Sequence, residues 1–309
     1  MKVSIILVSR DRCVDLYNTL CSLKNVSIPD GLAVELLIVD NGSSDDTANI
    51  VQDIEISGIE KKYIFEPRKG KAVGQNEALK FASGSIILLT DDDVRHPENW
   101  ISGMCSPIAS GSAVAVAGGV VLDTGLVRPW MSSRHRSWLA STEWLRRGNP
   151  QSLVGANMSL SRNVLNYIPM FDEELGPGAL GFADDCLFAS QLSKLGYKIH
   201  DALEVAVVHH FDQKRLLRSS WLNAAGRHAA SQAYIGYHWN HWKPKFLKLR
   251  LHKARRKLIR WRELNRFKNF QEGCSDIELD LAYFYFLYNE LLFLSKSARK
   301  YSYKGMRKL

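Results

Sequence analysis

Four short apolar runs alternate with helix-like segments over the first ninety residues, and this alternation constrains the fold more than any other feature of the chain. The intervening segments 12–23, 45–56 and 71–82 have apolar residues at helical spacing. Short apolar strands separated by helices indicate βαβ units and a buried parallel sheet. Ser43 or Ser44 is the expected N-cap of the second helix. The apolar runs are 3–8, 34–39, 62–65 and 86–90.

Polar residues follow three of these runs directly. Ser9 and Arg10 follow the first, Asp40 and Asn41 the second, and residues 91–93 (Asp-Asp-Asp) the fourth. Ligands of parallel sheets bind at the carboxyl ends of the strands. We therefore expect these side chains to meet at one binding site.

The middle of the chain is less regular, and the last third is helical. Strands are expected at 113–122, 153–161 and 205–208, a loop at 176–181 and a helix at 183–195. The segment 128–149 has no firm assignment. A helix is expected from Pro244 to Phe267, and a more apolar one over 277–295.

Three adjacent carboxylates at a strand end repel one another, and a divalent cation would relieve the repulsion. Carboxylate oxygens suit Mg²⁺ or Mn²⁺, which could bridge two phosphates and stabilise a leaving diphosphate. The alternative is a solvated acidic turn in which Asp92 or Asp93 caps a helix near Pro97.

The motifs together resemble glycosyltransferase family 2. VSIILVSRDR, LLIVDNGSSDDT, GKAVGQNEAL and ILLTDDDV occur in that order, followed by VGANMSLSR, ADDCLFASQLSKLGYKI and AVVHH, and they cover about the first 210 residues. The resemblance implies an α/β fold of the GT-A type, with a Rossmann-like, mostly parallel mixed sheet flanked by helices. It also implies an inverting, metal-dependent sugar transfer from a nucleotide-diphosphate donor. The expected domains are 1–215, with a nucleotide-binding half (1–100) and an acceptor half (101–215), and a basic helical extension over 216–309.

The resemblance assigns roles to individual residues. Asp40 matches an acid that contacts the nucleotide, and Asp91 and Asp93 match the two acids of the family's DxD motif, of which Asp93 binds the metal. His210 matches a C-terminal histidine that completes the metal shell or touches the diphosphate, with His209 as the competing assignment. The other residues expected to bind the nucleotide sugar are Ser9, Arg10, Asn41, Lys71, Asn76, Asp92, Gly155 and Asn157.

Asp184 and Asp185 match the family's catalytic acid pair, with Asp185 as general base and Asp184 in place of the usual Glu. A carboxylate within reach of the acceptor hydroxyl can take its proton as the oxygen attacks the anomeric carbon. The alternative is that both acids only occupy the first turn of a helix, where they interact favourably with the helix dipole.

Two departures from the family pattern qualify the prediction. Gln75 stands where an Arg often precedes Asn76, so Arg68, Lys69 or Lys71 would have to supply the positive charge for the phosphates. The Gln-x-x-Arg-Trp motif of processive members is absent after Gly196, which favours transfer of a single sugar. The sequence does not indicate which sugar or base is used, although a UDP-sugar is the first expectation, with a saccharide or lipid-linked glycan as acceptor.

The letters of residues 176–181 fit G-x-G-x-x-G, but the residues before them are acidic rather than a buried strand. We interpret this segment as a mobile loop beside the acceptor site.

The net charge of +9 is concentrated in one segment. Residues 243–270 contain twelve Lys and Arg and one acid, Glu263, whereas the rest of the chain carries 29 bases and 31 acids. A basic amphipathic helix can lie on an anionic membrane surface. Alternatively its apolar stripe packs on the catalytic domain, and a nucleic-acid interface is a third reading that no nucleic-acid module supports.

The remaining features indicate an intracellular protein. The five cysteines lack CxxC spacing, which favours reduced thiols. The first apolar run is too short for a signal peptide, and no stretch reaches the ~20 apolar residues of a membrane span. We expect a cytoplasmic location, with peripheral contact at the inner face of the membrane left open. The rival functions are a nucleotidyltransferase and a non-catalytic binding protein on a degenerate transferase fold.

Overall fold

The computed structural model describes residues 1–148, 150–265 and 271–309, which form two compact units. The first unit contains residues 1–127, 136–179 and 184–211, and the second contains residues 128–135, 180–183 and 212–309. Two short segments from the middle of the chain thus group with the C-terminal helices. The predicted functional boundary at residue 215 stays a prediction.

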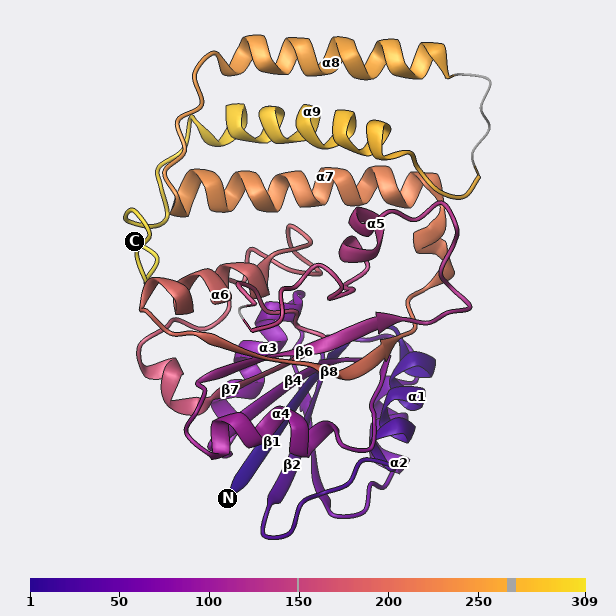
Figure 1. Cartoon of the computed structure of the whole chain (residues 1–309), viewed down its shortest axis with the longest axis vertical. Coiled ribbons are helices and arrows are strands. Elements are labelled where there is room, and N and C mark those ends of the chain that lie inside the picture. Colours follow the sequence, from indigo (N-terminus) through magenta and orange to yellow (C-terminus); the bar gives the residue numbers. More distant parts are fainter. Residues whose placement is uncertain (149, 266–270) are drawn as a thin grey trace. The chain divides into compact units, whose positions relative to one another are not determined.

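The first unit is built on one mixed sheet (Figure 1), in the strand order β3-β2-β1-β4-β7-β6-β8-β5. The pairs β1–β2, β1–β4 and β2–β3 are parallel, as the alternating pattern predicted, whereas β7 is antiparallel to both β4 and β6. The strands are β1 (Lys2–Ser9), β2 (Ala33–Asp40), β3 (Ile59–Phe65), β4 (Ile86–Asp91), β5 (Val94–Arg95), β6 (Ala115–Leu122), β7 (Asn157–Ser161) and β8 (Ile199–His209).

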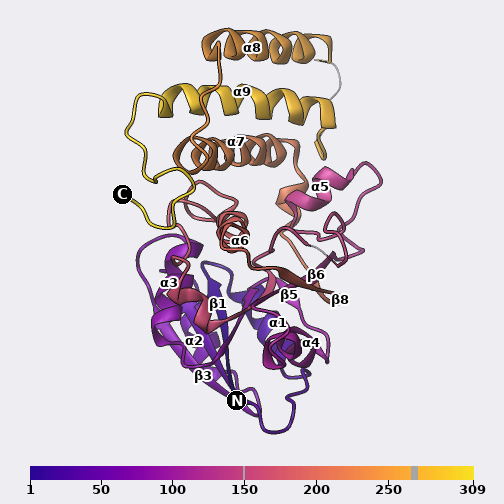
Figure 2. The same ribbon diagram turned by 60° about the vertical axis from the view of Figure 1, so that its left-hand side comes forward.

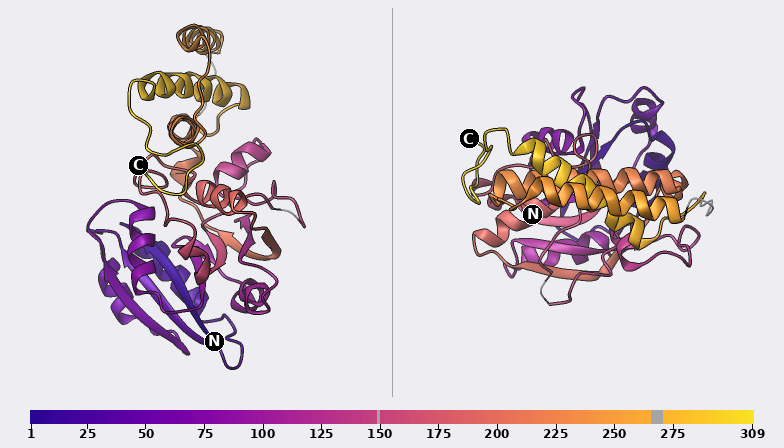
Figure 3. Two further views of the ribbon diagram at one scale, coloured as in Figure 1. Left: turned by 90° about the vertical axis from the view of Figure 1, so that its left-hand side faces the viewer. Right: turned by 90° about the horizontal axis from the view of Figure 1, so that it is seen from above.

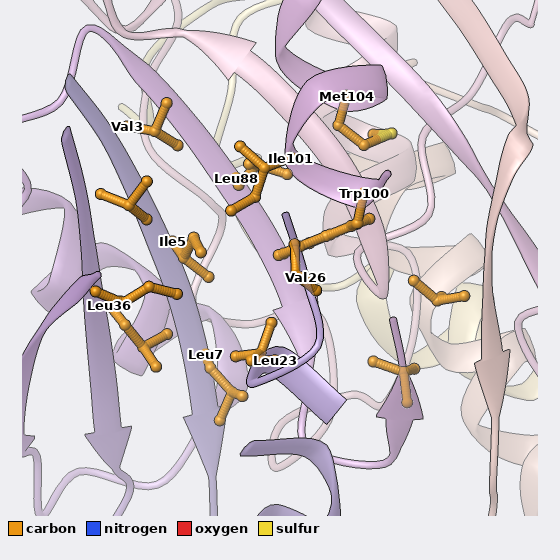
Figure 4. Packing of buried hydrophobic residues seen from close by; sticks show 14 of the residues in the cluster. Val3, Ile5, Leu7, Leu23, Val26, Leu36, Leu88, Trp100, Ile101 and Met104 are labelled. Atoms are coloured by element: carbon orange, nitrogen blue, oxygen red, sulfur yellow. The ribbon is translucent and has the colours of Figure 1, made fainter. Parts of the chain in front are cut away.

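Helices cover both faces of this sheet, because successive residues of a buried strand point to opposite faces. In β1, Ile5 packs toward α1 (Cys13–Leu23), α2 (Thr47–Asp53) and α4 (Trp100–Ala109), as Figure 4 shows for part of this core. Its neighbour Ile6 packs in the opposite core with α3 (Lys71–Phe81) and α6 (Asp184–Lys194). Burial on both faces explains why the run has no polar alternation.

The predicted cap of α2 was wrong. Neither Ser43 nor Ser44 caps the helix, since the N-cap position is Asp46 and the hydroxyl groups of both serines bond to Asp11. The carboxylate of Asp45 instead accepts from the backbone and hydroxyl of Thr47. Both serines therefore belong to the loop after β2, and α2 begins only at Thr47.

The second unit contains three long helices, and α9 (Asp276–Leu294) packs against both α7 (Arg218–Tyr234) and α8 (Leu247–Leu264). Figures 2 and 3 show the three in the order α7, α9, α8. The predicted basic helix begins at Leu247 rather than Pro244, and Phe267 lies outside the described residues. Shorter helical segments are α5 (Ser133–Trp138), η1 (Arg162–Asn166), η2 (Gln213–Leu216) and η3 (Ile235–Trp239).

The apolar stripe of α8 meets α9. Ala254 and Leu258 are the buried residues of α8, and Leu247 packs in a cluster with Leu287 and Leu291 of α9. Among the described residues, none of the helices combines the length and apolar character that a bilayer-crossing segment needs.

One buried carboxylate stabilises the amino end of the parallel sheet. Glu35 of β2 accepts hydrogen bonds from Ser4 of β1 and from the backbone and hydroxyl of Ser83, and Lys2 lies 2.9 Å away. Burial raises the pKa of Glu35, but the hydrogen bonds from Ser4, Ser83 and Lys2 lower it by more, to about 2. The ionised carboxylate is therefore part of the folded state at neutral pH.

Glu35→Gln is expected to lower the free energy of unfolding at pH 7 by about 1–3 kcal/mol, since buried donors lose a charged acceptor. Because the pKa of Glu35 is depressed on folding, this stability is present above about pH 4.5 and is lost as the pH falls toward about 2. Urea unfolding of both proteins across this range measures the effect. Glu60→Gln on the exposed edge is the control, and equal effects of the two changes would contradict the assignment.

Candidate functional site

The register of the parallel strands brings the predicted polar strand ends together. Ser9 pairs with Asp40 across β1 and β2, and Val8 pairs with Asp91 across β1 and β4. The side chains that follow these strands therefore start from one edge of the sheet, as the sequence pattern predicted.

Lys71 stands at the centre of one group of acids at this edge. Its ammonium contacts the carboxylate of Asp91, and a Cβ atom added to Gly155 would lie 3.3 Å from this nitrogen and 3.8 Å from Oδ2 of Asp185. Burial lowers the pKa of Lys71, but Asp91, Asp184 and Asp185 raise it above its usual value. The ammonium of Lys71 thus lies between acids of two elements, Asp91 at the end of β4 and Asp184 and Asp185 at the start of α6. These acids are about a hundred positions apart in the sequence.

The backbone fixes the position of Asp185. Its Oδ2 accepts from the N–H of Gly155 at 2.9 Å, and its Oδ1 accepts from the N–H of Cys186 at 2.7 Å. Burial, and then the charge of Asp185, raises the pKa of Asp184 to about 7; burial also raises the pKa of Asp185. The pair therefore holds a proton more readily than ordinary aspartates, and Asp185 is the more exposed of the two.

Gly176 leaves the space that Asp184 needs. A Cβ atom at position 176 would lie 2.8 Å from the carboxyl carbon of Asp184, and Gly176 has φ of 79°. Pro177 accepts a hydrogen bond from the backbone N–H of Lys71 at 2.8 Å. The beginning of the glycine-rich loop thus shapes the acid pair and is held to α3.

A second group of charges forms around Arg12, just after β1. Its guanidinium donates to Asp92 at 2.8 Å and to Asp93 at 2.7 Å. Ser9 donates from its hydroxyl to the other oxygen of Asp92 at 2.7 Å. Both carboxylates are buried, so Arg12 supplies charge that water does not.

His209 is the histidine that lies beside Asp93. Its Nε2 is 3.0 Å from Oδ2 of Asp93, and its Nδ1 is 2.7 Å from the carbonyl oxygen of Leu139. The side chain of His210, the first residue after β8, instead pairs with Asp123 at 2.9 Å. The structure thus places the competing assignment, His209, next to the DxD acid.

The two carboxyls held by Arg12 differ in their protonation. Burial raises the pKa of Asp93, but His209 and Arg12 more than offset this and hold that pKa below its usual range. Burial raises the pKa of Asp92 to about 7, despite the nearby Arg12. Asp93 is therefore the charged partner of Arg12, and Asp92 gains a proton first as the pH falls.

The predicted metal ligands Asp91, Asp93 and His210 do not form a cation site in this structure. Asp91 contacts Lys71, Asp93 contacts Arg12 and His209, and His210 faces Asp123. Oδ1 of Asp93 is buried without a hydrogen-bond partner, but a single oxygen is not a metal site. Among the described residues, no cluster of three or more His, Cys, Asp or Glu side chains could hold a metal ion.

Asp40 and Asn41 order the loops around the strand ends. Asp40 accepts from the hydroxyl of Tyr63 at 2.7 Å and from the N–H of Ser43 at 2.7 Å. Asn41 donates to the carbonyl of Arg68 and accepts from the N–H of Gly70, which ties down the loop before α3.

Three further predicted residues make contacts within the protein. Arg10 donates to the carbonyl oxygen of Asn41 at 2.8 Å. The side-chain amide of Asn76 donates from its nitrogen to the carbonyl oxygen of Phe171 and accepts with its oxygen from the N–H of Phe171. Asn157 is fully buried and bonds the carbonyl oxygens of Gly119 and Val205 and the indole of Trp100. These hydrogen bonds show scaffold roles for Asn76 and Asn157, while donor binding by either stays a prediction.

Arg12 is a charged residue of this group that the motif pattern did not single out. The two adjacent acids after β4 could have indicated it, because buried carboxylates need a cation and a neighbouring strand end can supply one. Arg12 follows the adjacent strand β1 within three residues of its end.

Comparisons with known proteins identify the family of the chain. Residues 4–168 match the family described as glycosyl transferase family 2. The chain belongs to glycosyltransferase family 2. A curated relative, the GalNAc(5)-diNAcBac-PP-undecaprenol beta-1,3-glucosyltransferase of Campylobacter jejuni, is 31% identical over 109 residues, which are 35% of this chain and 33% of the relative. The chain spans about a third of the length of the first curated relatives that it matches.

Solved structures of the same fold confirm the GT-A architecture that the sequence predicted for this family member. The mannosyltransferase PcManGT from Pyrobaculum calidifontis, solved in complex with GDP-Man and Mn²⁺, has a TM-score of 0.56 and 16% identity, and the match covers 96% of this chain and 75% of that one. S. aureus TarS 1-349 in complex with UDP has a TM-score of 0.51 and 20% identity, with 76% and 66% covered.

Proposed function

We propose that the protein transfers one sugar, with inversion, from a nucleotide-diphosphate sugar to a hydroxyl of a saccharide or lipid-linked glycan. The observation that carries the proposal is the group formed by Lys71, Asp91 and Asp185, which joins the end of β4 to the start of α6. In this proposal residues 1–100 form the nucleotide-binding half, 101–215 the acceptor half and 216–309 a helical extension.

Asp185 is the base in this reaction. Its carboxylate takes the proton of the acceptor hydroxyl while the hydroxyl oxygen bonds to the anomeric carbon. The bond from that carbon to the diphosphate breaks in the same step, and the nucleoside diphosphate leaves with the electron pair. The N–H groups of Gly155 and Cys186 orient the two carboxylate oxygens.

Lys71 balances charge in the same step. Its ammonium is the cation nearest to Asp91 in the described structure, and a donor diphosphate would bring further negative charge to this edge of the sheet. A preorganised cation there stabilises charge that builds on the leaving group. Lys71 also supplies the positive charge that is missing at Gln75, where an Arg often stands in the family.

The proposal also concerns the nucleotide base of the sugar donor and the class of acceptor. PcManGT was solved with GDP-Man and TarS with UDP, so both bases are to be tested. The Campylobacter relative carries undecaprenol in its name, which supports a lipid-linked acceptor here.

Donor hydrolysis tests the proposal without knowledge of the acceptor, since water can replace the acceptor hydroxyl. We expect one of a panel of UDP-, GDP- and dTDP-sugars to release nucleoside diphosphate, and the sugar to appear first with the inverted anomeric configuration by NMR. Release with retained configuration, or no release from any donor, would contradict the proposal. EDTA and added Mn²⁺ test the predicted divalent cation, for which the structure does not assemble the predicted protein ligands.

The pH dependence should report the acid pair. Because burial raises the pKa of Asp184 to about 7 and raises that of Asp185, the base is protonated at low pH. We expect kcat/KM to rise with pH through an apparent pKa near 7, which belongs to the coupled pair. Asp184→Asn removes one of the two like charges and should move this limb to lower pH. A profile that is flat between about pH 5 and 8 would argue against Asp185 as the base.

A further inference from the structure

The outward face of α8 is strongly basic. The helix carries eight Lys and Arg and one acid, Glu263, so its net charge is +7 with histidine neutral. All eight bases are exposed. Lys253, Arg256 and Arg260 recur at a spacing that places them on one face of the helix, opposite the stripe that includes Ala254 and Leu258.

Apolar side chains stand among these bases. Leu249 lies on the same outward face, four residues before Lys253, and is 50% exposed. Ile259 is 44% exposed and lies beside Arg260. Helices that bind a bilayer surface combine bases with apolar side chains in this way.

The protein itself does not satisfy this face. Of the acids in the ranges described by the structure, none forms an ion pair with Lys253, Arg256 or Arg260. The side chain of Arg250 points toward α9 instead, and its guanidinium lies 5.9 Å from the ring centre of Tyr288. The helix is held to the second unit by its apolar stripe, while its charges remain available to a partner.

We propose that the outward face of α8, defined by Leu249, Lys253, Arg256, Ile259 and Arg260, binds the surface of an anionic lipid bilayer. The bases would pair with lipid phosphates, and Leu249 and Ile259 would enter the boundary between headgroups and acyl chains. Nucleic acid offers the same charge but no apolar layer for these two side chains. This inference does not depend on the transfer reaction, and it can fail while that proposal stands.

Co-sedimentation of the full-length protein with lipid vesicles tests the inference. Vesicles of phosphatidylcholine with about a third phosphatidylglycerol should bind the protein, and pure phosphatidylcholine should not. Neutralising three bases in Lys253→Gln/Arg256→Gln/Arg260→Gln should weaken binding on the order of 100-fold, at about a factor of five per base. Binding should also fall as salt is added.

A matched control removes the same charge elsewhere. Lys24, Lys194 and Lys198 are exposed bases of the first unit. Their triple change to Gln should leave vesicle binding within about 3-fold, since none of them belongs to the proposed face of α8. Equal losses in both triple variants would show an effect of net charge alone and overturn the inference.

The apolar pair separates lipid from nucleic acid. Leu249→Ser/Ile259→Ser keeps every charge, and we expect it to weaken vesicle binding on the order of 10-fold, with the helix content unchanged by circular dichroism. Unchanged vesicle binding by this variant, or duplex DNA that binds more tightly than the vesicles, would contradict a bilayer as the partner.

Discussion

Asp185→Asn is expected to lower kcat of sugar transfer on the order of 1,000-fold and to leave the Kd for the nucleoside diphosphate within about 3-fold. The amide keeps the shape of the side chain and can still accept from Gly155, but it cannot take the proton of the acceptor hydroxyl. Single-turnover rates with the donor found by hydrolysis, together with calorimetric titration of the diphosphate, measure the two effects separately.

Asp53→Asn provides the control, because Asp53 is an exposed carboxylate at the end of α2. Its rate should match that of the wild type. If Asp185→Asn keeps kcat within about 10-fold of the wild type, another group takes the proton. Asp184 and Asp185 would then only interact with the dipole of α6 at its first turn.

Replacing Arg12 by methionine should give the largest loss of stability among single substitutions at the site. The change leaves Asp92 and Asp93 buried without their shared guanidinium. Removing one member of a buried ion pair costs on the order of 3 kcal/mol. Because the pKa values of both carboxyls rise when Arg12 is absent, the deficit should be largest at high pH and should shrink as the pH falls and the acids are protonated. Urea unfolding at several pH values measures this.

Two further variants show whether charge is the cause. Arg12→Met/Asp92→Asn removes one uncompensated charge and should recover part of the stability, whereas Arg146→Met, at an exposed position, should have little effect. A loss in Arg12→Met that does not vary with pH would indicate lost packing rather than lost charge compensation.

Much of the sheet could be predicted because its pattern is local. Apart from Ser4 and Glu35, residues 3–8 and 34–39 are apolar on both faces since helices cover both sides of β1 and β2, and such runs are readable in the sequence. The meeting of Ser9, Asp40 and Asp91 at one edge follows from parallel pairing alone.

The partners of the acids could not be predicted in the same way. Which base faces Asp91, and which faces Asp93, depends on the directions of Lys71 and Arg12 in three dimensions. Motif matching placed the histidine role at His210, the first residue after β8, whereas the structure places His209, the last residue of that strand, beside Asp93.

The central claim is that the strand ends and Lys71 form a nucleotide-diphosphate site, and thermal unfolding with UDP, GDP and dTDP at millimolar concentration tests it most directly. We predict that one diphosphate raises Tm by about 5 °C, as expected for a ligand near 100 times its Kd. The matching nucleoside should have no such effect, and the shift should be lost in Lys71→Met. Added Mn²⁺ and EDTA show whether a cation takes part in this binding. No shift with any diphosphate, with or without the metal, would contradict the account and favour a non-catalytic protein on the transferase fold.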